Sequence, residues 1–227
     1  MRIRAPMLLA LTCVVAAGCS DSNDPNSEAQ VRALHAAATV ANVDVLVDGT
    51  VQAQNVAFGA GSQYRAVGAG KQKLQVRPNG ATTLLHESEP TLSDGGNYTI
   101  VVVKFGSGTS VLLLRDDADA PAAGKAKLRV VNVAPAATTA DVYVTAPGAN
   151  LATATAAATN LDQNLATQYA ALTAGTYQVR FTTPGTKTVL FDAGNIELAA
   201  GQTRTLVIMD KSGGGMPLSK VVLADRN

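Results

Sequence analysis

The chain has 227 residues, and its 18 lysines and arginines against 17 acidic residues give a formal net charge of +1. This near-neutral balance argues against nucleic acid as a partner, because nucleic-acid binding needs a basic surface. Hydrophobic residues make up 47% of the sequence, aromatic residues make up 4%, and tryptophan is absent. We therefore expect a core of many small valine and alanine side chains, in one large domain or two small ones.

The first 18 residues have the three parts of a secretory signal peptide. Arg2 and Arg4 give a positive start, residues 7–15 form an apolar stretch, and small residues follow at positions 16–18. The stretch is too short to span a bilayer, which needs about 20 apolar residues. Ala-Ala-Gly followed by Cys19 resembles the lipobox of bacterial lipoproteins, in which the cysteine receives a diacylglyceryl group and becomes the mature N-terminus.

An ordinary signal peptide, cleaved so that a free cysteine remains near the new terminus, is the alternative. Cys13 is a poor acceptor because Thr12 precedes it and cleavage there would split the apolar stretch. In the lipoprotein resemblance, Ser20 in place of an aspartate favours the outer membrane if the cell is Gram-negative. We therefore expect a palmitate-carrying protein of the cell envelope that is anchored through Cys19.

Cleavage after residue 18 removes two of the 18 basic residues and none of the 17 acidic ones, so the mature chain is close to −1. Cys19 is then the one remaining cysteine, which excludes an intramolecular disulfide and a cysteine metal site. Residues 19–30 are polar, contain a proline and lack periodicity. Such a composition cannot bury enough surface to fold, so we expect a lipidated flexible tether.

From residue 31 onward, short β-rich runs alternate with turn residues, which is typical of an antiparallel β-sandwich. Asp48-Gly49 and Asn79-Gly80 are two-residue hairpin signals. Residues 73–77 alternate polar and apolar as a half-buried strand does, and residues 100–103 are continuously apolar, which predicts a central strand. The expected strands are residues 31–35, 43–47, 51–56, 63–67, 73–77, 82–87, 98–105 and 110–115.

This β-rich block occurs twice in the sequence. Residues 31–47 align without gaps on residues 128–144, which places Asp44 on Asp141. Further on, Tyr64 matches Tyr169 at an offset of 105 instead of 97, so the second copy carries eight extra residues before Tyr169.

Three later segments match in the same order along the chain. The pairs are residues 84–87 with 189–192, 99–103 with 205–209, and 112–116 with 221–225. We therefore expect two similar domains, residues 31–117 and 127–227, joined by a linker over residues 118–126.

These repeated features resemble the bacterial domain-of-unknown-function family 4397 (DUF4397), found in tandem on secreted and lipid-anchored proteins. The resemblance is carried by the opening Val-Arg and Leu-Arg strands, by Asp44-Val45 and Asp141-Val142, and by the Tyr…Ala-Gly turns at 64–70 and 169–175. It covers nearly all of the mature chain and implies two tandem copies. It implies no activity and no catalytic residue, because the family has no known function.

Tyr98 ends an L-x-D-x-G-x-Y pattern over residues 92–98 that is similar to the tyrosine corner of immunoglobulin-like domains. In the second copy Arg204 stands in place of Tyr98, and Tyr177 offers a weaker substitute. The Cys…Trp…Cys core of antibody domains is missing. The expected fold is therefore all-β, with two tandem antiparallel β-sandwich domains of immunoglobulin-like type.

The two histidines of the mature chain, His35 and His86, are weak candidates for chemistry. A metal site needs three or four convergent ligands, and the second copy has Asn132 and Phe191 at these two positions. A serine or threonine nucleophile would need a histidine beside it, and no spacing supports one. We predict strand residues, no enzyme and no cofactor.

Residues 67–71, Val-Gly-Ala-Gly-Lys, superficially resemble a phosphate-binding loop. A P-loop needs a longer glycine loop, a serine or threonine after the lysine, and a following helix. Gln72 follows Lys71 and a strand comes next, while the second copy has no lysine in this loop. The sequence therefore predicts a turn.

Asp116, Asp117 and Asp119 at the end of the first domain are weak candidates for calcium ligands, because calcium takes six to eight oxygens. They lack the glycine and distal glutamate of an EF-hand loop, and Asp225 is their one counterpart in the second copy. We prefer a solvated charge run at a strand end. Without a metal these charges repel each other, so we expect the two domains to move independently.

Tyr64 and Tyr169 could stack on a sugar ring, but repeated residues more often serve the repeated fold. The leading functional expectation is a lipid-anchored, non-enzymatic binding, adhesion or scaffolding module of the cell envelope, with a surface protein or polysaccharide as ligand. A carbohydrate-binding or hydrolytic accessory protein is the alternative. An exposed aromatic row would favour sugar binding, and a buried Ser-His-carboxylate cluster would favour hydrolysis.

Overall fold

The computed structural model describes residues 27–226, and within them the chain is all-β. The expected signal peptide and Cys19 lie outside the described residues. Between residues 27 and 226, no helix has the length and apolar character needed to cross a bilayer.

We call residues 27–117 the N-terminal half and residues 125–226 the C-terminal half. The strands of the N-terminal half are β1 (Glu28–His35), β2 (Val43–Val47), β3 (Thr50–Val56), β4 (Arg65–Gly68), β5 (Gly70–Lys71), β6 (Leu74–Pro78), β7 (His86–Ser88), β8 (Thr91–Leu92), β9 (Asn97–Phe105) and β10 (Gly108–Arg115). The elements of the C-terminal half are β11 (Lys125–Asn132), β12 (Thr139–Thr145), the 3-10 turn η1 (Leu151–Thr153), β13 (Ala158–Asp162), β14 (Leu165–Ala166), β15 (Ala170–Thr173), β16 (Gly175–Thr182), β17 (Val189–Leu198), β18 (Thr203–Met209) and β19 (Ser219–Arg226).

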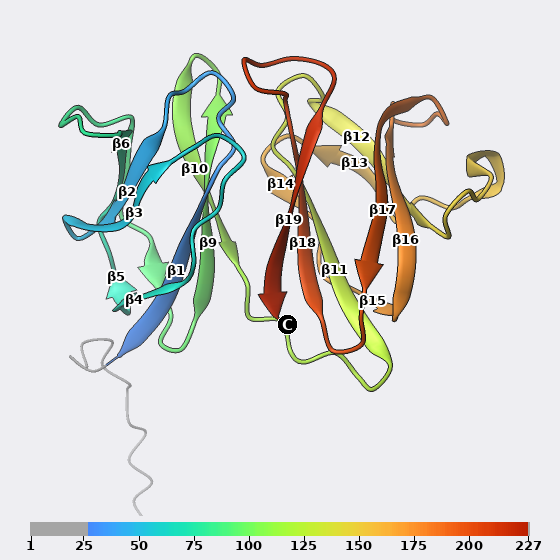
Figure 1. The fold of residues 1–227 in the computed structure, drawn as a ribbon, viewed down its shortest axis with the longest axis horizontal. Coiled ribbons are helices and arrows are strands. Elements are labelled where there is room, and N and C mark those ends of the chain that lie inside the picture. Colours follow the sequence, from blue (N-terminus) through green and yellow to red (C-terminus); the bar gives the residue numbers. More distant parts are fainter. Residues whose placement is uncertain (1–26, 227) are drawn as a thin grey trace, which may run out of the picture.

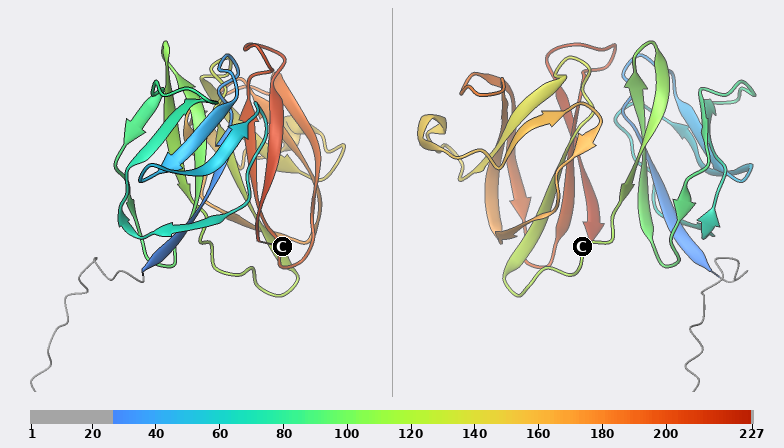
Figure 2. Two further views of the ribbon diagram at one scale, coloured as in Figure 1. Left: turned by 60° about the vertical axis from the view of Figure 1, so that its left-hand side comes forward. Right: turned by 180° about the vertical axis from the view of Figure 1, so that it is seen from behind.

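Each half contains an inner and an outer sheet. In the N-terminal half the inner sheet has the order β10-β9-β1-β4 and the outer sheet β3-β2-β6-β7, with a separate pair formed by β5 and β8. In the C-terminal half the inner sheet has the order β14-β11-β18-β19, with β15 also paired to β11, and the outer sheet is β13-β12-β16-β17. Figures 1 and 2 show the sheets as four layers, with the two inner sheets in the middle.

The sequence predicts purely antiparallel strand pairing, but two of the pairings in the structure are parallel. β1 pairs with β9 in parallel, and β11 pairs with β18 in parallel, while the remaining ladders are antiparallel. The reason is topological, because the chain leaves the inner sheet after its first strand, builds the outer sheet and then returns beside that strand. A parallel neighbour needs such a long crossover.

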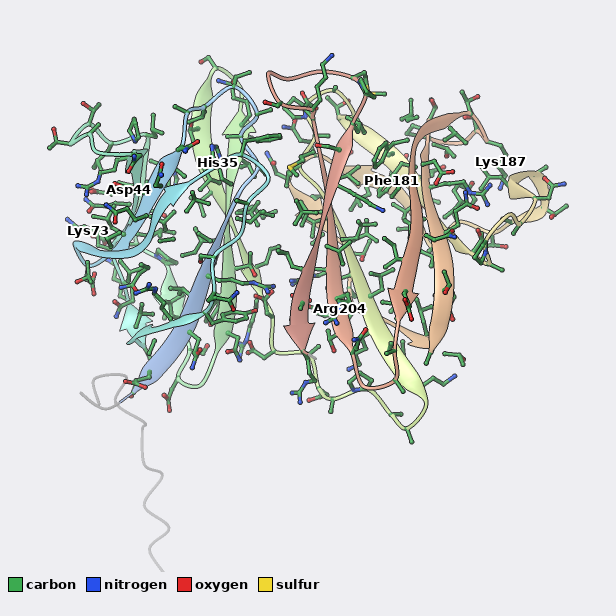
Figure 3. All side chains as sticks on the ribbon, viewed as in Figure 1. His35, Asp44, Lys73, Phe181, Lys187 and Arg204 are labelled. Atoms are coloured by element: carbon green, nitrogen blue, oxygen red, sulfur yellow. The ribbon has the colours of Figure 1, made fainter. Side chains whose placement is uncertain are left out.

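Each half has its own hydrophobic core between its inner and outer sheets. Val31 and Ile100 of the inner sheet meet Val45 and Val76 of the outer sheet in the N-terminal core. Leu128, Leu206, Val142 and Phe181 take the corresponding places in the C-terminal core. Phe181 is fully buried there, and Figure 3 shows its place between the two sheets.

The central strands of the inner sheets are buried on both faces. In β9, Ile100 and Val102 belong to the N-terminal core, whereas Val101 and Val103 belong to a third cluster between the two halves. This two-sided burial explains why residues 100–103 are continuously apolar, and it confirms the predicted central strand. β6 instead buries Leu74 and Val76 and leaves Gln75 partly exposed, as predicted for a half-buried strand.

The predicted hairpin at Asp48-Gly49 is confirmed. It joins β2 to β3, and both residues have the positive φ values, 46° and 77°, that such turns require. Asn79-Gly80 also forms a turn, but it does not lead directly into a strand. β7 begins at His86, so the predicted strand over residues 82–87 is wrong for most of its length, and Leu84 is exposed there instead of pairing in the sheet.

The repeated aspartate of the sequence has a structural role in both halves. Asp44 Oδ1 accepts a hydrogen bond of 2.9 Å from the backbone of Asn55, and Asp141 Oδ1 accepts one of 2.8 Å from the backbone of Asn160. Both asparagines have positive φ, 53° and 52°, where the neighbouring edge strand is irregular. Each buried carboxylate therefore fixes an irregular turn of its edge strand.

The tyrosine corner predicted around Tyr98 is present. The Tyr98 hydroxyl accepts a hydrogen bond of 2.8 Å from the backbone N–H of Ser93. Gly96 makes room for this contact, because a Cβ atom on it would lie 2.7 Å from Tyr98 Cε2 and 2.9 Å from the backbone oxygen of Ser93. In the C-terminal half, Tyr177 donates a hydrogen bond of 2.7 Å to the backbone oxygen of Thr173 instead.

Two predicted boundaries shift in the structure. β1 starts at Glu28, so the last residues of the expected tether already belong to the inner sheet, where Gln30 pairs with Asn97. β11 starts at Lys125, within the segment assigned to the linker. In both places polar residues pair at the end of a strand whose apolar part lies further along.

Candidate functional site

The two inner sheets pack against each other, and we call this contact the seam. Its apolar part contains five buried residues from each half, and they are equivalent positions of the repeat. The pairs are Leu34 with Val131, Ala36 with Val133, Val101 with Val207, Val103 with Met209, and Leu114 with Leu223. The seam is therefore approximately two-fold symmetric, with the same patch of the repeat on each side.

Two buried arginines cross the seam in opposite directions. Arg32 of β1 forms an ion pair with Asp225 of β19 and donates a hydrogen bond of 2.7 Å to the backbone oxygen of Ala224. Its Nε donates to Thr99 Oγ1 of its own half at 2.7 Å. Both charged side chains are almost completely buried, at 6% and 0% exposure.

Arg129 of β11 makes the same contacts in the other direction. It forms an ion pair with Asp116 at the end of β10 and donates a hydrogen bond of 2.7 Å to the backbone oxygen of Arg115. Its Nε donates to Thr205 Oγ1 at 3.0 Å. Each arginine therefore binds an aspartate and the last carbonyls of an edge strand in the opposite half.

A tyrosine completes each cluster. The Tyr64 hydroxyl donates to Asp116 Oδ2 at 2.7 Å, and the Tyr169 hydroxyl donates to Asp225 Oδ2 at 2.8 Å. The guanidinium carbon of Arg32 lies 4.6 Å from the centre of the Tyr64 ring, and that of Arg129 lies 4.5 Å from the Tyr169 ring. The repeated tyrosines therefore serve the seam through a hydrogen bond and a cation–π contact.

Burial governs the electrostatics of these clusters. It raises the pKa of Asp116, while the positive charge of Arg129 opposes that rise. Burial also raises the pKa of Tyr64 and of Tyr169 far above the usual value of a phenol, so both hydroxyls remain donors. The polar groups of the seam are thus bonded to one another, and their arrangement holds the two halves together.

The expected flexible joint is contradicted by this contact. Asp116 lies in the seam and is 6% exposed, so it does not belong to a solvated charge run. Asp117 accepts a hydrogen bond of 2.9 Å from the Asn97 backbone and pairs with Arg115, and the Asp119 backbone oxygen accepts one from Lys127 at 2.8 Å. The three aspartates thus diverge to separate partners, and residues 27–226 contain no group of three or more possible metal ligands.

The histidines lie where the sequence predicts, on or near strands. His35 is fully buried, its Nδ1 accepts from the Ala37 backbone, and its Nε2 lies 3.2 Å and 3.1 Å from the carbonyl oxygens of Val40 and Ala41. Asn132 does the same in the C-terminal half, since Oδ1 accepts from Ala134 and Nδ2 donates to Ala137. His35 therefore fixes the loop after β1 in its neutral form.

Stability should fall on acidification because of this histidine. Burial lowers the pKa of His35 below 6.5, so below pH 6.5 the unfolded chain takes up a proton that the folded chain does not. For one such site the free energy of unfolding drops by at most about 1.4 kcal/mol per pH unit. The free energy of unfolding, measured with urea between pH 7.5 and 5.5, should depend less on pH in His35→Asn than in the parent protein. Asparagine is the residue at the equivalent position of the second copy. Burial lowers the pKa of His86 as well, but His86 is only half-buried, so His86→Asn should reduce the slope less than His35→Asn does. An unchanged slope in His35→Asn would contradict the role.

Residues 67–71 comprise the end of β4, a bend at Ala69 and β5, so the predicted turn is confined to this bend between two strands. Gly70 has a φ of 87° and begins β5, and Lys71 pairs with Glu89 on the exposed surface. The loop therefore belongs to the sheet architecture.

Two open grooves lie along one edge of the seam and share Tyr64, Asp225 and Arg226. The first has a volume of about 500 Å³ and runs between residues 61–64 and residues 221–226. The second has a volume of about 460 Å³ and is bounded by residues 116–120 together with Asn97 and Thr203. The buried Oγ1 of Thr203 has no hydrogen-bond partner among the described residues.

Sequence reasoning found the residues of the seam without recognising their contact. These residues occupy equivalent positions of the repeat: Arg32 and Arg129, Tyr64 and Tyr169, and Asp116 and Asp225. One sequence feature could have indicated the contact. In both copies the inner strands are continuously apolar, which is typical of strands buried on two faces, and an arginine lies at the start of one of them.

A family model described as "Domain of unknown function (DUF4397)" matches residues 29–143. No curated protein matches the chain. Among solved structures, the TIE protein of Bacillus anthracis is similar with 11% identity and a TM-score of 0.26, over 82% of this chain and 34% of that one, so the chain spans about a third of its length.

Two further solved structures are similar at the same low level. A family 26 carbohydrate-binding module from Eubacterium rectale, solved with maltoheptaose, has 11% identity and a TM-score of 0.27 over 86% of this chain and 96% of that one. A putative cell adhesion protein from Bacteroides eggerthii has 11% identity and a TM-score of 0.21 over 87% of this chain and 95% of that one.

Proposed function

Because the chain belongs to the DUF4397 family, which has no assigned activity, we propose from the geometry that it is a non-enzymatic binding module of the cell envelope, held on the membrane by a lipid on Cys19. In this proposal the two halves are tandem immunoglobulin-like β-sandwich domains that act as one body. The outer membrane is its place in a Gram-negative cell, and its ligand is a surface protein or polysaccharide.

The observation that carries this proposal is the doubly bridged seam. Arg32 and Arg129 each use a buried ion pair and a backbone carbonyl of the opposite half, and apolar contacts surround them. A body fixed in this way presents its grooves in a constant geometry, which reduces the entropy cost of binding. The polar groups of the seam are occupied by one another, which favours binding over catalysis.

The grooves beside the seam are the proposed contact surface. They present exposed polar side chains such as Gln63 and Asp119, which suit a ligand rich in hydrogen-bonding groups. The polysaccharide version of the role is favoured by this polar lining. A peptide could pair with the neighbouring edge strand β19, but the Ala224 carbonyl of this strand already accepts a hydrogen bond from Arg32.

Binding should depend on the first groove. Residues 20–227, produced as a soluble protein, should bind to purified envelope polysaccharide on a biosensor surface, and Gln63→Arg should weaken that binding at least tenfold by narrowing the groove. Gln168→Arg, at the equivalent exposed position of the second copy and outside both grooves, should leave it unchanged. Equal binding by both variants would remove the groove from the proposal.

The anchor is tested separately. Cys19→Ser should abolish labelling with radioactive palmitate and move the protein from the membrane fraction to the soluble fraction, because several acyl chains are needed for stable anchoring. Persistent labelling of this variant would contradict the lipoprotein assignment. Loss of labelling with unchanged polysaccharide binding by the soluble body would separate the anchor from the ligand site.

A further inference from the structure

The C-terminal half has an apolar slot that opens into its core. The slot has a volume of about 140 Å³ and lies between the inner sheet, at β11 and β15, and the outer sheet, at β12 and β13. Its floor is formed by the buried residues Leu128, Val130 and Val142. The strands β13, β14 and β15 are at the edges of their sheets, so the slot enters from the side of the sandwich.

At the corresponding place the N-terminal half has an open groove of about 390 Å³ over Ala53 and residues 60–63, and the lining of this groove does not include the core residues that correspond to the floor of the slot. Val47, Ala53 and Val67 are buried there, with exposures of 4%, 7% and 8%. Their counterparts lie in the slot and are only partly buried; they are Val144, Ala158 and Leu172. The counterparts follow from the repeat and from the matching pairs Val45↔Ala53 and Val142↔Ala158.

The slot coincides with the segment in which the second copy is longer. Ala157, Ala158, Thr167 and Gln168 line it, and all four lie in the stretch before Tyr169 that carries the eight extra residues. At the mouth, Thr167 Oγ1 accepts from the Val130 backbone at 3.0 Å and donates to the Gln168 carbonyl at 2.9 Å. The one hydroxyl at the slot is thus satisfied internally and does not call for a polar ligand.

We propose that this slot is a binding site for a small apolar group, of the size of one aromatic ring or a short alkyl chain. An apolar cavity of about 150 Å³ stays dry and takes up benzene when it is lined by aliphatic side chains. The slot has a similar volume, and its lining consists of leucine, valine and alanine apart from Thr167 and Gln168. This site is distinct from the grooves beside the seam and does not depend on the function proposed for them.

Benzene is the probe for this site. When benzene is added to residues 20–227, the methyl NMR signals of Leu128, Val142 and Leu172 should shift in a saturable way. The signals of Val31, Val45 and Val67, the equivalent residues of the N-terminal half, should not shift, because these residues do not line its groove. The absence of any saturable shift at the slot would overturn the proposal.

Matched substitutions at equivalent positions give a second test. Ala158→Leu should fill the slot, weaken benzene binding at least tenfold and leave the melting temperature unchanged or higher. Ala53→Leu should lower the melting temperature, because Ala53 is buried against the N-terminal core and a larger side chain would overpack it, and should leave benzene binding intact. Unchanged benzene binding in folded Ala158→Leu would overturn the proposal. If that variant does not fold, the smaller Ala158→Val must still reduce the affinity for the proposal to stand.

Discussion

Replacement of Arg129 by alanine is expected to lower the free energy of unfolding by about 3–5 kcal/mol, the usual cost of leaving a buried charge without its partner. The carboxylate of Asp116 is 0% exposed and would lose its nearest cation, leaving Arg32 Nη2 at 3.6 Å from Asp116 Oδ2, while the carbonyl of Arg115 would lose a donor. Urea unfolding of residues 20–227 at pH 7.5 measures the change directly.

The control for this prediction is the double variant Arg129→Leu with Asp116→Leu. Removing both charges leaves no unpaired carboxylate, so the double variant should recover a large part of the lost stability. Arg32→Ala should cost at least as much as Arg129→Ala, because Arg32 makes the equivalent contacts in the opposite direction and its Nη2 also lies 3.6 Å from Asp116 Oδ2. Lys71→Ala, which breaks an exposed pair, should change little. A negligible effect of Arg129→Ala would show that the seam does not hold the halves together.

Gly96→Ala is expected to cost about 2–4 kcal/mol, which combines overpacking with the loss of a hydrogen bond. The added methyl group would lie 2.7 Å from Tyr98 Cε2 and 2.9 Å from the Ser93 oxygen, so the ring must move away from the Ser93 N–H. The backbone itself cannot yield easily, because the Gly96 carbonyl accepts from Gln30 at 2.8 Å. Thermal or urea unfolding gives the measurement.

Tyr98→Phe separates the two contributions, since it removes the hydroxyl and should cost about 1 kcal/mol. The repeat supplies a matched position as well. Gln202 takes the place of Gly96 in the C-terminal half, where Arg204 replaces Tyr98, and its Oε1 accepts a hydrogen bond of 3.0 Å from the backbone of Ala199. Gln202→Ala removes this bond without a steric clash, so it should cost about 1 kcal/mol, less than Gly96→Ala. A Gly96→Ala variant as stable as the parent would mean that the tyrosine corner is dispensable.

The sequence was most informative where one local rule decided the structure. The hairpin at Asp48-Gly49 needed two residues that tolerate positive φ, and the corner at Tyr98 needed a glycine two residues earlier. The family and the all-β class followed from patterns of the same kind. These features depend on neighbours in the chain, so a single sequence could reveal them.

The seam was harder to predict because its partners are far apart in the chain. Arg32 and Asp225 are separated by 193 positions, and each looks like an ordinary strand-end charge on its own. Asp116 stood beside Asp117 and Asp119, so proximity in sequence suggested one acidic cluster, whereas the fold sends them to different partners. The apolar slot could not be predicted from the extra length of the second copy alone, because it results from the different exposure of otherwise similar residues in the two copies.

The two-fold symmetry of the seam determines whether the contact between the halves depends on protein concentration. A contact with the same residues on both sides could equally form between two separate copies of one half, and its occupancy would then rise and fall with concentration. Here residues 118–124 join the partners, so they meet at an effective concentration in the millimolar range, however few molecules the cell makes. The arrangement of the two halves in each molecule is therefore independent of the protein concentration.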